Sequence, residues 1–175
     1  MNRRVTWCLA LAAVLGLPAL ASAQAKPFEF ALYSPIQVRN PDDEIQVLRL
    51  SLIYGRNESV KGLDVGLVAR NTGGVSKGLQ YALVGIVDGD FVGWQNNGVS
   101  ITRGEITGIQ SGLYNQAAQG EVAQFGLVNQ ARDVSGFQLG LINLAENLYG
   151  VQIGLVNVIS SKEAFGVLPL VNWKF

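Results

Sequence analysis

The sequence predicts an all-β fold in which the chain coils into a parallel β-solenoid of about eight to nine short rungs. The first observation is a phrase that recurs, most cleanly at residues 136–143 and again at 150–157. The second is that apolar residues alternate with Gly and Gln inside each copy, which is the period of a β-strand. The third is that the connections between copies are alike in length and residue type, which favours rungs stacked on their neighbours.

Residues 1–23 have the pattern of a signal peptide. Arg3 and Arg4 give a positive start, an apolar run follows, and Ala21-Ser22-Ala23 supplies the small residues of a cleavage site. The apolar run is too short and too broken for a helix that spans a membrane. We therefore expect an exported protein that is periplasmic, associated with the outer membrane or extracellular.

Residues 24–46 are expected to form an N-terminal cap over the open end of the solenoid. Alternating Phe and Leu at residues 28–32 suggest an extended segment, and Asn-Pro-Asp-Asp at 40–43 signals a turn. The acidic run at 42–44 fits either a small cation site or a solvated turn. We interpret it as a turn, because a calcium loop also needs Gly and regular ligand spacing.

The repeat domain spans residues 47–175, and each copy is numbered from a first residue that is usually Gly. These first residues are Val47, Gly62, Gly78, Gly93, Gly108, Val122, Gly136 and Gly150. Positions 2, 4 and 6 are mostly large and apolar, whereas positions 1, 3 and 5 are usually Gly, Gln and Gly. This alternation predicts a strand whose apolar side chains, Tyr81 included, face the core and whose Gln side chains face outward.

Stacking of the copies predicts two ladders of side-chain amides along the solenoid axis. The first comprises Asn115, Asn129, Asn143, Asn157 and Asn172. The second, on the outer face, comprises Gln80, Gln95, Gln110, Gln124, Gln138 and Gln152. Arg49 and Asp64 take the Gln position in the first two copies, which predicts a cross-rung ion pair on that outer face.

The same alignment of the copies also predicts which residues form the corners of the rungs and where the solenoid ends. Gly and Asn are expected at the corners, because both adopt a left-handed backbone at low cost. The copy at 93–100 has Asn97 and Ser100 in place of Gly and Asn, so we expect a bulge or a rung-level irregularity there. A last, degenerate copy contains Pro169, which has no backbone N–H to donate to a neighbouring strand, so we expect the stacking to end there.

A small antiparallel outer-membrane β-barrel is the alternative fold. Export, strand-length copies, an apolar face and the terminal Phe175 are in its favour. Such a barrel alternates short turns with longer loops, so its natural period would be a pair of strands. The uniform connections and the lack of aromatic girdles at strand ends favour the solenoid.

Composition excludes several kinds of chemistry. The chain has no His, and its one Cys, Cys8, lies in the signal peptide, so His- or Cys-based nucleophile sets and zinc, copper or haem sites are excluded. Loss of Arg3 and Arg4 leaves 11 basic residues against 13 acidic, which gives no electrostatic case for nucleic acid. The remaining carboxylates that we considered for a catalytic pair are Asp64, Asp88, Asp90, Glu105, Glu121, Asp133, Glu146 and Glu163. Apart from Asp64 they mostly fall in connectors, which is typical of solvated turns, so we predict no catalytic, cofactor-binding or metal site.

The tandem Gly-Leu-Gln-x-Gly-Leu-Val-Asn phrase, over about residues 45–175, resembles a family of exported bacterial surface-repeat proteins. The resemblance includes the opening phrase at 50–57 and the closing phrase at 168–173. It implies a location at the cell surface or outer membrane and supplies no catalytic residues. We therefore expect a non-enzymatic scaffold or binding surface of the cell envelope, whose candidate partners are other envelope proteins, a surface glycan or further copies of itself. The alternatives are a small outer-membrane barrel and a self-assembling fibre subunit.

Overall fold

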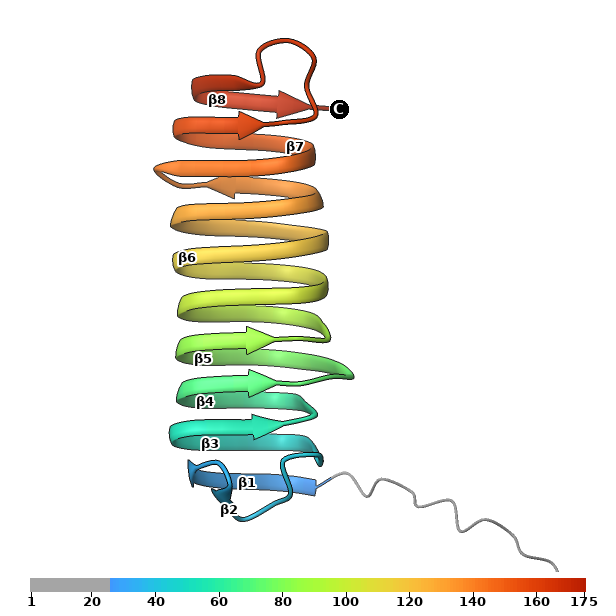
Figure 1. Cartoon of the computed structure of the whole chain (residues 1–175), viewed down its shortest axis with the longest axis vertical. Helices are drawn as coiled ribbons and strands as arrows, with labels where there is room; N and C mark the ends of the chain where they lie inside the picture. The colour runs from blue at the N-terminus through green and yellow to red at the C-terminus, as the bar shows by residue number, and fades with distance from the viewer. Residues whose placement is uncertain (1–25) are drawn as a thin grey trace, which may run out of the picture.

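The computed structural model describes residues 26–175, and these residues form a β-solenoid of about nine turns (Figure 1). Of the described residues 84% lie in strands and none lies in a helix. The predicted fold class is therefore confirmed. The expected signal peptide, residues 1–23, lies outside the described residues and stays a prediction.

Residues 26–175 form eight strands in one continuous sheet. They are β1 (Lys26–Tyr33), β2 (Ile36–Gln37), β3 (Glu44–Asn57), β4 (Ser59–Asn71), β5 (Val75–Val87), β6 (Asp90–Leu139), β7 (Ile142–Ile159) and β8 (Val167–Lys174). β6 runs through several turns without a break, which explains its 50 residues. From β1 to β7 the neighbours β1–β3, β3–β4, β4–β5, β5–β6 and β6–β7 all pair in parallel.

This parallel pairing decides between the two folds that the sequence allowed. Each copy goes once around the axis and lies on the copy before it, as Figure 1 shows. Corresponding repeat positions face each other, so that Leu63 pairs with Leu79 and Gly136 with Gly150. The antiparallel barrel is therefore wrong.

Both ends of the solenoid carry an antiparallel strand. β2 pairs antiparallel with β1 at the N-terminal end, and β8 pairs antiparallel with β7 at the C-terminal end. The last copy is thus no parallel rung, and Asn172 lies opposite Gln152 instead of above Asn157. The prediction that Asn172 continues the Asn ladder is wrong, because the chain reverses between residues 159 and 167.

Gly at position 1 makes a corner of the six copies that begin with Gly, and Gly120 has a positive φ just before the copy that begins with Val122. Gly62, Gly78, Gly93, Gly108, Gly136 and Gly150 all have φ between 116° and 151°. A Cβ on Gly78 would lie 2.2 Å from the carbonyl oxygen of Gly62 one rung before, so only Gly fits this stack. The Asn residues take no left-handed conformation, since the described non-Gly residues with positive φ are Phe165 and Leu170. The prediction that the Asn residues adopt a left-handed backbone is therefore wrong.

The copy at 93–100 contains no bulge, because its register with β5 is continuous from Val75↔Asp90 to Val87↔Thr102. What differs in this copy is instead which side chains it buries. Asn97 is buried at the position of the usual Gly and donates to Gln80 Oε1 at 3.1 Å and Ser100 Oγ at 3.1 Å. Backbone register shifts lie toward the two ends instead, in β1 and β3 at the N-terminal end and between Gly154 and Asn157 at the C-terminal end.

The two sides of the repeat strand are the reverse of those predicted. The Gln side chains at position 3 point into the solenoid and are at most 1% exposed. The apolar side chains at positions 2, 4 and 6 point outward, and Tyr81, expected in the core, is 61% exposed. The physical reason is space: Gly at position 5 leaves room inside for the Asn side chains, because a Cβ there would meet their amide atoms.

The apolar core lies in the other half of each rung, inside the connectors. Small apolar residues follow the Asn, and larger ones precede the next copy. The buried cluster comprises Val87, Phe91, Ile106, Ala117, Val122, Ala131, Val134, Ala145, Leu148 and Ile159. One side of the interior is therefore apolar, and the other is an array of amides.

Candidate functional surface

The Gln ladder runs along the polar side of the interior. Each Gln donates its Nε2–H to the Oε1 of the Gln one rung before. The donor–acceptor distances are 3.0 Å for Gln95→Gln80, 2.8 Å for Gln110→Gln95 and Gln124→Gln110, and 2.6 Å for Gln138→Gln124 and Gln152→Gln138. The predicted ladder is confirmed, but its predicted place on the outer face is wrong.

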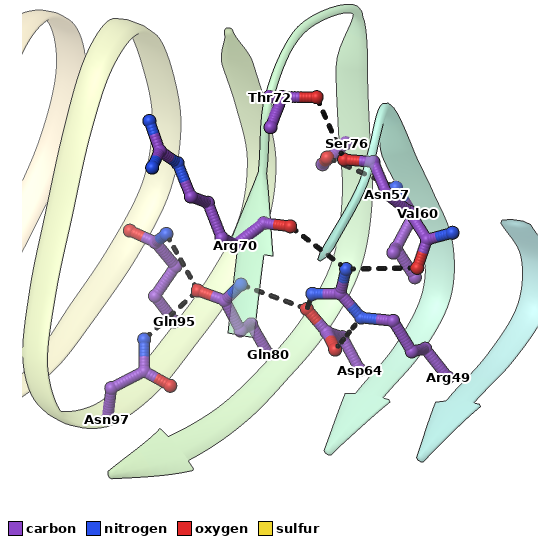
Figure 2. Close-up of polar contacts among 10 residues, drawn as sticks. All are labelled: Arg49, Asn57, Val60, Asp64, Arg70, Thr72, Ser76, Gln80, Gln95 and Asn97. Atoms are coloured by element: carbon purple, nitrogen blue, oxygen red, sulfur yellow. Dashed lines mark hydrogen bonds and ion pairs between the residues drawn. The ribbon is translucent and has the colours of Figure 1, made fainter. Parts of the chain in front are cut away.

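A buried ion pair begins this column, as Figure 2 shows. Gln80 donates to Asp64 Oδ2 at 2.9 Å, and Arg49 donates to both Asp64 oxygens at 2.7 Å. Arg49 also donates to Asn57 Oδ1 at 3.4 Å and to the Arg70 carbonyl at 3.1 Å. The cross-rung pair was predicted correctly, but it is internal, with side-chain exposures of 0% and 3%. At this end of the ladder Gln80 has an N–H to donate, and a carboxylate, which can only accept hydrogen bonds, receives it. The Arg49 guanidinium compensates the charge of that carboxylate.

Glu29 continues the same column beneath Arg49, with which it pairs in the parallel register. The residue is fully buried, and its Oε1 accepts the backbone N–H of Val38 at 3.1 Å. Burial raises the pKa of the Glu29 carboxyl above its usual 4.5. Sequence reasoning missed this residue, although Phe28-Glu29-Phe30 has the same alternation as Leu48-Arg49-Leu50.

The Asn ladder lies beside the Gln ladder and has the opposite direction. Each Asn donates Nδ2–H to Oδ1 of the next rung, at 2.9 Å for Asn115→Asn129, 2.8 Å for Asn129→Asn143 and 2.7 Å for Asn143→Asn157. Each also donates to the backbone carbonyl at position 4 of that rung. Gly at position 5 provides the space, because a Cβ on Gly140 would lie 2.6 Å from Asn129 Nδ2.

With the amides turned inward, the outside of the repeat strand forms a continuous apolar surface, which we call the apolar face. It consists of the outward residues at positions 2, 4 and 6, none of which is buried. Its apolar members are Phe28, Phe30, Leu32, Leu48, Leu50, Leu52, Leu63, Val65, Leu67, Leu79, Tyr81, Leu83, Trp94, Ile109, Leu113, Ala123, Phe125, Leu127, Phe137, Leu139, Leu141, Val151, Ile153, Leu155, Val171 and Trp173. None of the positions that form this face carries a charged side chain.

The few polar groups of the apolar face bond to one another near its middle. Trp94 Nε1–H donates to Ser111 Oγ at 2.7 Å, and the Ser111 hydroxyl donates to Asn96 Oδ1 at 3.1 Å. Beside them, Gly98 and Asn96 form a shallow hollow with Leu67, Tyr81 and Leu83. The face is therefore apolar, with a polar row near its middle and shallow hollows between its outward side chains, at Gly98 and also nearer the N-terminal end.

The charged residues lie away from this face, on the connectors. Asp88 is bound by Arg70 at 2.9 Å and by Arg103. Partial burial favours the neutral acid, but the two Arg hydrogen bonds outweigh it and hold the pKa of Asp88 below its usual 3.8. Among the carboxylates considered from the sequence, only Asp64 is buried. Two of the exposed ones, Glu121 and Asp133, line one pocket on the connectors together with Tyr149 and Lys174.

Within residues 26–175, no three His, Cys, Asp or Glu residues are grouped so that they could hold a metal ion. Nor does any helix in that range have the length and apolarity to cross a membrane. Comparisons of the chain with protein-family models, curated proteins and solved structures returned no significant match.

Proposed function

We propose that this chain is an exported, non-enzymatic protein of the cell envelope whose apolar face is a binding surface. The observation that carries the proposal is the exposure of that face along the whole solenoid. Ten strands about 4.8 Å apart and about five residues wide give it an area of roughly 700 Å². The largest exposed apolar patch on an ordinary soluble monomer is about 300–600 Å², so a face of this size marks an interaction site.

The distribution of polar groups supports binding over catalysis. Inside the solenoid the Gln amides of one column bond to one another and to the Arg49–Asp64 pair, whereas Glu29 Oε2 and the Asn71 amide have no hydrogen-bond partner among the described residues. The outward side of the same strands offers mainly apolar contact area. Export is supported by the pattern of residues 1–23 alone. Growth into an end-to-end fibre has less support, because antiparallel strands β2 and β8 close the two ends.

Thiol accessibility in envelope preparations tests this proposal. Leu127→Cys places a thiol on the apolar face, and Gln119→Cys places one on a connector, where both native side chains are exposed. We expect a membrane-impermeant maleimide to label Gln119→Cys freely and Leu127→Cys slowly until denaturant releases the bound surface. Equal labelling of the two thiols in the envelope would contradict a binding role for the face, and recovery of the chain in the cytoplasm would contradict export.

A further inference from the structure

The side chains on one half of the apolar face are complementary to those on its other half, which indicates the partner that covers it. This inference rests on the proposed binding role of the face. Ten strands stack along it, and its midpoint lies between the strand at 94–98 and the strand at 109–113. We propose that a second copy of this chain covers the face, antiparallel to the first, about a two-fold axis that runs along the strands through this midpoint. Each strand then meets the strand at the same distance on the other side of the midpoint, with repeat positions matched.

The central row of side chains fits this symmetry. Position 4 of the two middle strands is Asn96 in one and Ser111 in the other, so the two-fold axis sets each of these polar groups against the other one of the second copy. At position 6 it sets Leu113, 62% exposed, over the hollow at Gly98. The small residue of each copy thus receives the large residue of the other.

The next row outward has the same relation, and it includes a charge pair. The strand at 79–83 meets the strand at 123–127, so that Leu79 lies over Ala123 and Tyr81 over Phe125. Just before these strands, at the edge of the face, stand Lys77 and Glu121, both exposed. The symmetry sets Lys77 of each copy beside Glu121 of the other, which occurs twice per dimer.

The other face-to-face two-fold arrangement, with parallel solenoids, is less complementary. It would place each strand on its own equivalent, so that Tyr81 meets Tyr81 and Phe125 meets Phe125, and it would leave Lys77 and Glu121 without opposite charges. Both arrangements set some large residues against small ones, but only the antiparallel one sets the acid Glu121 against the base Lys77. Sheets pack face to face about 10 Å apart, as in β-sandwiches.

Area and charge also favour a second copy over a lipid surface. A face of roughly 700 Å² per copy is close to the 800 Å² or so that each partner contributes to a standard stable interface. Binding to an anionic bilayer uses a basic rim. Residues 24–175 instead have 11 basic against 13 acidic residues, and Lys61 beside the face already binds Glu44 at 2.9 Å. A bilayer would also leave the polar row at Asn96 and Ser111 against acyl chains.

Sedimentation of the purified chain, with a charge swap, tests the proposal. We expect a dimer in the wild type. Lys77→Glu sets two acids against each other at both edges and should weaken the dimer about tenfold, since each exposed pair changes from attraction to repulsion. Glu121→Lys should do the same. The double variant restores two opposite-charge pairs and should return the dissociation constant to within about threefold of the wild type. Inside one chain the two residues stand three rungs apart, about 14 Å, which is beyond the screening length at physiological salt.

A second pair of variants separates the dimer from the binding role. Leu83→Glu puts a charge inside the interface, where the residue is 62% exposed in the single chain, and should weaken the dimer by at least about 100-fold. Val167→Glu, at 64% exposure outside the face, should leave it unchanged.

A wild type that is monomeric at high micromolar concentration would overturn the dimer, and protection of Leu127→Cys in the envelope would then still support another partner. Flotation of the wild type with phosphatidylcholine vesicles, lost in Leu83→Glu, would overturn it in favour of lipid. If the wild type is a dimer but the double variant Lys77→Glu/Glu121→Lys does not recover its dissociation constant, the antiparallel arrangement is overturned.

Discussion

The buried pair Arg49–Asp64 gives the sharpest prediction for the stability of the solenoid. Arg49→Gln leaves the Asp64 carboxylate inside the solenoid with the Gln80 amide as its remaining neighbour in the ladder. Asp64→Gln leaves a fully buried guanidinium opposite a neutral amide. Removal of one partner from a buried pair costs about 3–5 kcal/mol, because the other charge stays uncompensated. We therefore expect each single variant to lose that much of its free energy of unfolding.

The double variant Arg49→Gln/Asp64→Gln should behave quite differently. In this variant Gln would occupy the column in every copy from the one that starts at Val47 onward. Each new amide would donate toward the N-terminal end, as the six natural Gln side chains do. The Arg49 hydrogen bonds to Asn57 and Arg70 are lost, so we expect the double variant to lie about 1–2 kcal/mol below the wild type. The two substitutions would then be strongly non-additive.

Urea unfolding followed by far-ultraviolet circular dichroism measures these free energies, provided that all variants share one slope. Lys61→Gln is the matched control, because the Lys61–Glu44 pair is also cross-rung but has side-chain exposures of 40% and 25%. It should cost less than about 1 kcal/mol. If the double variant lost the sum of the two single losses, the ion pair would not be interchangeable with two rungs of the ladder, and the reasoning would fail.

Three further predictions concern single positions. Gly140→Ala should lose about 1–3 kcal/mol of unfolding free energy, because its Cβ would lie 2.4 Å from the Gly126 carbonyl oxygen, whereas Gly73→Ala, with its nearest neighbour at 3.8 Å, should stay within about 0.5 kcal/mol of wild type in the same urea assay. Glu29→Gln should be more stable than wild type near neutral pH and equal to it below pH 4.5, because a carboxyl whose folded pKa is raised loses stability as pH rises; a constant difference across a pH series would contradict this. Asp88→Asn should show the opposite dependence, with a cost of at most about 1 kcal/mol near neutral pH that disappears as pH falls below 3.8, checked by the same series.

The sequence was sufficient for the period, the parallel stacking and both ladders, because these follow from the spacing of Gly, Gln and Asn. It failed on which side of the strand is inside. Strand alternation shows that two sides differ, and a slip of one residue exchanges them. The usual rule places Leu139 and Leu141 inside, but Gly140 between them is the position whose missing Cβ admits the Asn129 side chain. Gly on both sides of Gln was the available signal for an inward-facing amide.

The chemistry of the site was predicted less well than the fold, and for the same reason. Arg49 and Asp64 were paired correctly from their spacing, yet their burial depends on the inside-out orientation. Tyr81 was expected in the core and instead stands on the apolar face. A repeat pattern also could not predict the strand direction at the C-terminal end, because β8 reverses direction after a loop that no other described copy contains.

The opposite directions of the two ladders have a consequence for the length of such rods. Each copy of the kind found between Gly108 and Asn157 contributes one Gln amide whose N–H points toward the N-terminal end and one Asn amide whose N–H points toward the C-terminal end. The dipoles of the two columns therefore cancel along the axis, instead of summing as aligned peptide dipoles do in a helix. Duplication of a copy lengthens the rod without building up an axial field, so the number of copies can vary at little electrostatic cost.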